Sequence, residues 1–185
     1  MNLVARAKGI VLDPHAEWRA IAAEPASPAA LITGYVAILA AIPAVGGFIG
    51  TSVVGIAGYR TPVVAGLLSA ILGYLISLAG VFLVAFVIDA LAPSFGGRKD
   101  FVSAMKVAAF APTAAWLASV FMALPVLAIL SALGLYSLHL FYLGLPVLMR
   151  VPQEKALGYF LAVMVGAIIV WAIILFLPGR LFGVV

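Results

Sequence analysis

The sequence has no cysteine and very little charge, and each shortage excludes a class of chemistry. Without cysteine there is no disulfide, no thiol catalysis and no thiolate metal site. Only 9% of the 185 residues are charged and 66% are hydrophobic, whereas a soluble domain has about 25% charged residues. The ten basic residues are scattered over the loops, which excludes a nucleic-acid-binding face. This is the composition of an integral membrane protein.

The chain also lacks the local patterns on which most enzymes and cofactor proteins depend. No serine lies in a nucleophile elbow, and the Gly96–Lys99 stretch lacks the spacing of a P-loop. Histidines and carboxylates do not recur at metal-ligand spacing along one helix. We therefore expect no enzymatic activity, no cofactor and no metal site.

Long apolar runs dominate what is present, and they predict an all-α membrane protein with a bundle of five spans. The uncharged run 107–149 is long enough for two spans, and Leu124–Pro125 is the expected corner because proline disfavours helix in the residue before it. We place the spans at about 29–57, 62–92, 101–123, 126–148 and 156–177.

Prolines and glycines predict where these spans bend or stop. As a straight helix the first span would be about 45 Å long, against a bilayer core of about 30 Å. Pro43 and the pair Gly46–Gly47 are the expected break in it. Pro112 should bend the third span, and Pro178–Gly179 should close the fifth.

Residues 1–28 form a separate segment in which charged residues are mixed with apolar ones at helical spacing. The segment predicts one or two amphipathic interfacial helices, with Asp13–Pro14 as a helix start. Trp18 next to Arg19 suits the lipid headgroup region. Two interpretations stay open: a tether for the first span, or a functional docking element.

The basic residues divide unequally between the two ends of the five spans, which predicts the orientation. The C-terminus is expected outside and the N-terminus in the cytoplasm, with Arg60 and Arg180 on the outer side. Three loop residues besides Trp18 are expected to contact headgroups: Arg98, Lys99 and Arg150. The inner-side basic residues are Arg6, Lys8, Arg19, Arg98, Lys99, Lys106, Arg150 and Lys155.

Small residues recur in patterns that predict close helix packing. One pattern is a stripe with a period of seven residues in the second span, and the other is a GxxxG pair in the first span. The glycines concerned are Gly66, Gly73 and Gly80 for the stripe, and Gly46 and Gly50 for the pair.

Few ionisable residues lie within the spans, and such residues are functional candidates because their burial in lipid is costly. We predict a polar site open to the cytoplasm, built from Asp89, Lys106 and His139 with Tyr142 nearby. Two structural alternatives stay open: an Asp89–Lys106 ion pair that joins the second and third spans, or a Lys106 that extends to the headgroups.

Three stretches resemble the Yip family, membrane proteins named for interaction with Ypt/Rab GTPases, and most of all its bacterial inner-membrane branch. The resemblance implies five helices, an inner-membrane location and, for eukaryotic members, a role in membrane organisation. Because the sequence lacks the long cytosolic tail with its Asp-Leu-Tyr segment, GTPase binding is not carried over. The stretches are LDPHAEWRAIAAEP, VIDALAPSFGGRKDFVSAMKVAAFAPTAAWLA and LYSLHLFYLGLPVLMRVPQEKALGY.

The sequence favours a non-enzymatic protein that organises or remodels the membrane by helix packing. Its expected partners are the lipid bilayer and either a second copy or another membrane protein. The alternative is a small transporter, channel or lipid-handling protein that uses the polar site.

Overall fold

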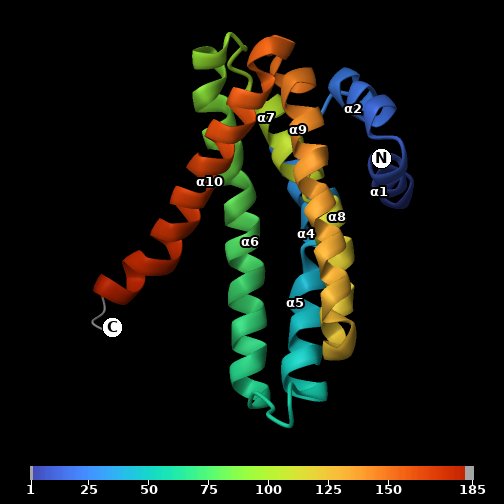
Figure 1. The fold of residues 1–185 in the computed structure, drawn as a ribbon, viewed down its shortest axis with the longest axis vertical. Coiled ribbons are helices and arrows are strands. Elements are labelled where there is room, and N and C mark those ends of the chain that lie inside the picture. The colour runs from blue at the N-terminus through green and yellow to red at the C-terminus, as the bar shows by residue number, and fades with distance from the viewer. Residues whose placement is uncertain (1, 182–185) are drawn as a thin grey trace.

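The computed structural model describes residues 2–181, with side chains up to Ala172. It is helical, with five helical stretches long and apolar enough to cross a membrane, which confirms the predicted fold class (Figure 1). The described spans are Pro28–Val54, Val63–Phe95, Phe101–Ala123, Pro125–Met149 and Gln153–Ala172.

Two short helices precede the spans, α1 (Leu3–Leu12) and α2 (Pro14–Ala23). The Asp13 carboxylate accepts a hydrogen bond from the Ala16 N–H at 3.2 Å and Pro14 follows it, as the sequence predicts. Both helices pack against the side of the bundle at one end, where α2 contacts α9 (Tyr136–Met149) and α1 contacts α8 (Thr113–Ala118) (Figure 1).

The first span is irregular. It consists of α3 (Pro28–Leu31), α4 (Ala37–Leu39) and α5 (Ala41–Phe48), with π-helical segments at residues 32–36 and 49–54. The α-helix is interrupted at Ala40, just before Pro43, which has no N–H to donate to the preceding turn. This confirms the bend predicted at Pro43, whereas Gly46–Gly47 lie inside α5.

The second span contains α6 (Val63–Leu91), which continues into a 3-10 turn at Ala92–Phe95. The turn ends at Gly96, whose φ of 78° is a left-handed conformation that favours glycine. The loop that follows leads to Asp100. Its carboxylate accepts from the Ser103 N–H at 3.1 Å and so caps the third span, as predicted.

The third span bends where the sequence predicts, because α7 (Phe101–Phe110) and α8 (Thr113–Ala118) are separated by a turn at Pro112. It closes in a 3-10 segment that ends at Ala123. Leu124 is then extended, with φ −119° and ψ 102°, which confirms the predicted corner.

The fourth span begins as a 3-10 segment, Pro125–Leu135, and continues as α9 (Tyr136–Met149). The fifth is α10 (Gln153–Leu181), so the stop predicted at Pro178–Gly179 is wrong. A proline removes a single backbone donor, and in an apolar phase the neighbouring backbone groups remain paired only if the helix continues.

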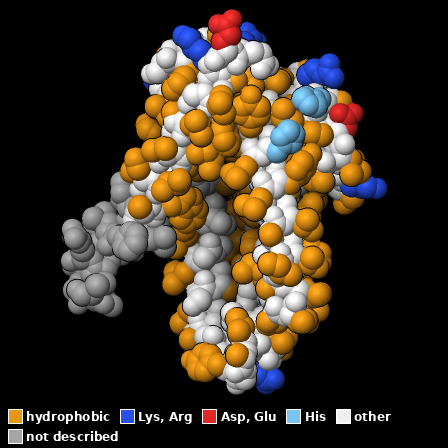
Figure 2. Space-filling view, in the orientation of Figure 1, with side chains coloured by type: hydrophobic (Ala, Val, Ile, Leu, Met, Phe, Trp, Pro, Cys, Tyr) orange, Lys and Arg blue, Asp and Glu red, His pale blue; other side chains and the backbone are white. Residues whose placement is uncertain are grey.

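The third span is the centre of the bundle. In its most apolar stretch 67% of the residues are buried, against 22% for the second span and 17% for the fifth. The core is dense toward the end that carries α1 and α2, while α10 diverges from α6 toward the other end (Figure 1). Most Lys and Arg side chains on the visible face gather at the densely packed end, which we call the basic end (Figure 2).

The glycines predicted to pack contact three different neighbours. A Cβ on Gly46 would lie 3.0 Å from the Ser119 carbonyl oxygen, and one on Gly50 would overlap the Met122 carbonyl, so this pair packs on the end of the third span. In the stripe, Gly66 packs on Ser52, Gly80 packs on Trp171, and Gly73 faces open space.

Replacing Gly50 with alanine tests this packing, with Gly47→Ala as the matched control. The new methyl group of Gly50→Ala meets the Met122 carbonyl, and such overpacking costs about 1–3 kcal/mol. A Cβ at Gly47 meets nothing within 4 Å, so that variant should be as stable as the wild type. Thermal unfolding in detergent measures both, and equal midpoints would contradict the packing.

Candidate functional site

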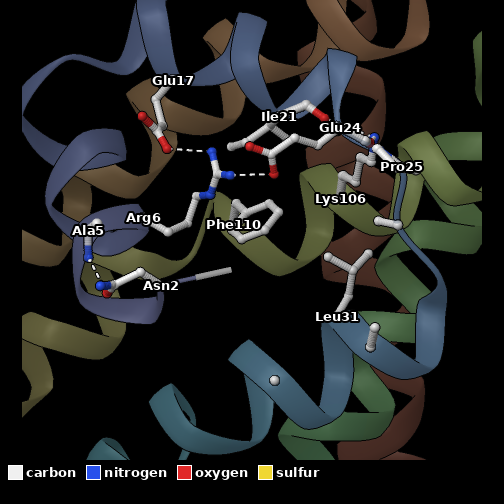
Figure 3. Close-up of a pocket in the computed structure, with 13 residues that line it drawn as sticks. Asn2, Ala5, Arg6, Glu17, Ile21, Glu24, Pro25, Leu31, Lys106 and Phe110 are labelled. Carbon is white, nitrogen blue, oxygen red and sulfur yellow. Dashed lines mark hydrogen bonds and ion pairs between the residues drawn. The ribbon is translucent and has the colours of Figure 1, made fainter.

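A cavity of about 700 Å³ with a charged lining lies at the basic end, between the N-terminal helices, the start of the first span and α7 (Figure 3). It lies beside the first turns of a span, where a bilayer changes from headgroups to hydrocarbon. Its lining residues are Asn2, Ala5, Arg6, Glu17, Ile21, Glu24, Pro25, Ala26, Ala30, Leu31, Gly34, Lys106 and Phe110.

Arg6 forms the centre of the charged lining, although it is only 7% exposed. Its two terminal nitrogens donate to the carboxylates of Glu17 and Glu24, and its guanidinium carbon lies 5.7 Å from the centre of the Phe110 ring (Figure 3). Its Nε is buried and has no hydrogen-bond partner in the described part of the chain. The side chain therefore ties α1 to both ends of α2.

Lys106 of α7 supplies the second buried cation and is 6% exposed. Its Nζ donates to the carbonyl oxygens of Ile21 at 2.8 Å and Glu24 at 2.6 Å. These carbonyls lie at the C-terminal end of α2, where backbone acceptors lack helical partners and a cation is favourable. Lys106 therefore caps α2 and does not extend along the outside of the bundle toward the surrounding headgroups, as the alternative predicted.

The predicted polar site is not formed, because its residues lie in different places. Asp89 makes no ion pair with Lys106 within residues 2–172, and its buried Oδ1 has no partner there. His139 is exposed beside Tyr136, with ring centres 5.5 Å apart, and Tyr142 packs against a phenylalanine of α10. Lys106 alone of the four lines the cavity, because α2 attracts its ammonium away from α6.

The headgroup contact predicted for Trp18 is also wrong. The side chain is 0% exposed and fills a gap over Gly144 of α9, where a Cβ would lie 2.6 Å from its ring. Burying an indole in a gap that only glycine leaves open removes more apolar surface than lying at the interface. Arg98, Lys99 and Arg150 are exposed, and their headgroup contacts stay a prediction.

Asp100, just outside the third span, is held in its charged form. Partial burial raises the pKa of this carboxyl group, but hydrogen bonds from Ser103 and the nearby Lys106 charge outweigh burial and lower the pKa below its ordinary value. A lowered pKa means that the cap contributes stability at neutral pH, and this contribution is lost only as the pH falls through that lowered value.

Sequence reasoning missed Arg6, Glu17 and Glu24 as members of one site. A signal was present, since Glu17, Ile21 and Glu24 follow one another at intervals of four and three residues, the spacing of one helical face. Arg6 likewise lies on the apolar face of α1, beside the buried Ala7 and Ile10. A charge at a buried helical position predicts a buried counter-charge.

The spans and the packed N-terminal helices together define a polytopic helical membrane protein. The chain belongs to the Yip1 domain family, whose match covers residues 8–177 and confirms the resemblance seen in the sequence. Two similar proteins are named "Inner membrane protein YohC", from Escherichia coli strains K12 and CFT073. Each is 26% identical over 184 residues, and the match covers 95% of this chain and 94% of the relative. No solved structure matches the chain.

Replacing Arg6 with methionine tests the ion cluster, with Lys8→Met as the control on the same helix. Arg6→Met leaves two carboxylates without their cation, and losing a charged hydrogen bond costs about 1.5–3 kcal/mol. Because Lys8 is exposed, its replacement should have no such effect. Hydrogen exchange over residues 3–23 reports the difference, and equal protection in both variants would contradict an anchoring role for Arg6.

Proposed function

We propose that this protein organises the membrane without catalysing a reaction, and that it does so by packing its exposed spans against a second copy or another membrane protein. Little of the described chain lies outside the spans and α1–α2, because the connecting loops at 55–62, 96–100 and 150–152 are short. A chain of this form interacts mainly through its lipid-facing helix surfaces.

One observation favours protein as the partner of the second span. A groove of about 470 Å³ runs between the first two spans, with Gly73 open at its surface. Besides Pro43 and Phe48, it is lined by glycines, alanines and hydroxyl side chains. Lipid contact requires only apolar bulk, whereas small residues let another helix approach the backbone closely. The groove residues on α6 are Gly66, Ser69, Ala70, Gly73, Tyr74 and Ser77.

We also propose the orientation that the basic residues predict, with the N-terminus in the cytoplasm. With the basic end in the cytoplasm, α1 and α2 lie at the inner surface of the membrane and the groove at Gly73 lies in the hydrocarbon. The divergence of α10 from α6 then opens the bundle within the outer half of the bilayer (Figure 1).

A transporter or channel is less well supported. That reading requires Asp89, Lys106 and His139 to line one pathway, and they occupy separate positions. The second and fifth spans also leave apolar faces to the surroundings instead of enclosing a polar route.

Blocking the groove tests self-association. Because the chain has no cysteine, Ser94→Cys in the exposed part of the 3-10 turn accepts a single dye. Energy transfer between differently labelled copies in vesicles then measures association. Gly73→Leu should weaken association about tenfold, a loss of about 1.4 kcal/mol of contact. Gly34→Leu adds the same side chain at another open glycine and should leave association unchanged. Transfer at the level of random encounters, or equal in both variants, would contradict the proposal.

A further inference from the structure

The two cationic side chains that line the cavity at the basic end have hydrogen-bond donors without partners. Arg6 and Lys106 are both more than nine-tenths buried, and the Arg6 Nε has no partner in the residues described. An ammonium group has three donors, and Lys106 directs two of them to the α2 carbonyls. Buried donors without acceptors are unfavourable, so two cationic side chains lining one cavity are suited to an anionic oxygen.

The lining is nevertheless neutral overall, because Glu17 and Glu24 balance the two cations. A simple anion such as inorganic phosphate would gain from the cations and be repelled by the carboxylates. A molecule with one negative and one positive group, suitably spaced, satisfies both. Glu24 is 52% exposed, so its carboxylate can accept a further positive partner while it remains paired with Arg6.

The cavity also has an apolar side that continues toward the bilayer. Ala30, Leu31 and Gly34 line it from the first turns of the first span, with Phe110 opposite. Gly34 lies six residues after the start of that span, or about 9 Å deeper at helical rise. The site therefore extends from the headgroup level into the first carbons of the acyl chains.

We propose that this cavity binds the headgroup of a zwitterionic phospholipid of the phosphoethanolamine type. The phosphate lies toward the remaining donor of Lys106, the ammonium toward Glu24, and the glycerol against Leu31 and Gly34. A primary ammonium donates hydrogen bonds to a carboxylate, whereas the quaternary ammonium of choline favours a cage of aromatic rings. The described lining offers Phe110 as its one aromatic ring.

The test uses the full chain in detergent, with phosphatidylethanolamine, phosphatidylcholine and phosphatidylglycerol of identical acyl chains in competition. Native mass spectrometry then counts the lipid bound. We expect phosphatidylethanolamine to be favoured about tenfold over either competitor, which corresponds to one charged contact. Equal binding of the three lipids overturns the proposal, and so does displacement of the lipid by inorganic phosphate.

Two variants locate the site without removing a residue that holds the fold. Gly34→Leu fills the apolar side, where a Cβ meets nothing within 4 Å, and should lower occupancy about tenfold. Gly73→Leu, at an open glycine outside the cavity, should leave occupancy unchanged. Equal occupancy in both variants overturns the assignment of the lipid to this cavity.

Glu24→Gln tests separately whether the Glu24 carboxylate binds the ammonium group of the lipid. The substitution gives the lining a net positive charge, so preference should shift from phosphatidylethanolamine toward the anionic phosphatidylglycerol. An unchanged preference would show that Glu24 does not bind the ammonium and would overturn the zwitterionic assignment. Lys106 is unsuited to this experiment because it also caps α2.

Discussion

Neutralisation of buried charge is the constraint on which the basic end of this protein depends. Arg6 and Lys106 are excluded from water in a chain with few charged residues, and a buried cation without partners would be strongly destabilising. Both find their partners on α2, Arg6 through two carboxylates and Lys106 through two carbonyls. The N-terminal segment is thus held to the third span by bonds that link residues more than 80 positions apart.

The half of the bundle near the basic end is packed more densely than the opposite half. Near the basic end the third span is enclosed by its neighbours, and Met105, Met149 and Tyr159 are fully buried. Toward the other end, the 3-10 segment Pro125–Leu135 has no buried residue and α10 diverges from α6 (Figure 1). One half is therefore closed around a charged cavity, while the other leaves apolar helix faces available to lipid or protein.

Local signals in the sequence were sufficient for the outline of the fold. Caps and prolines act on the backbone within a few residues, so their effects can be predicted without tertiary structure. The examples are Asp13–Pro14, Asp100, Pro112 and Leu124–Pro125. The five spans followed from hydropathy alone, since lipid requires long, continuous apolar helices.

The candidate site could not be predicted in the same way. The partner of Lys106 depends on how α2 folds back onto α7, and the burial of Trp18 depends on the gap at Gly144 of α9. The glycine stripe does not form one packed face, because Gly66 and Gly80 contact different spans and Gly73 contacts neither. Periodicity defines a face of a helix, and only tertiary packing decides what covers it.

The most direct test of the central claim, that the N-terminal helices pack on the bundle and bury Trp18 there, is the environment of Trp18. The chain has three tryptophans, so replacing Trp116 and Trp171 with phenylalanine leaves Trp18 as the single fluorophore. In vesicles we predict blue-shifted emission that neither aqueous acrylamide nor spin-labelled headgroups quench, because the side chain is fully buried. Strong quenching by the labelled headgroups would place α2 in the lipid interface and contradict the packing against α9.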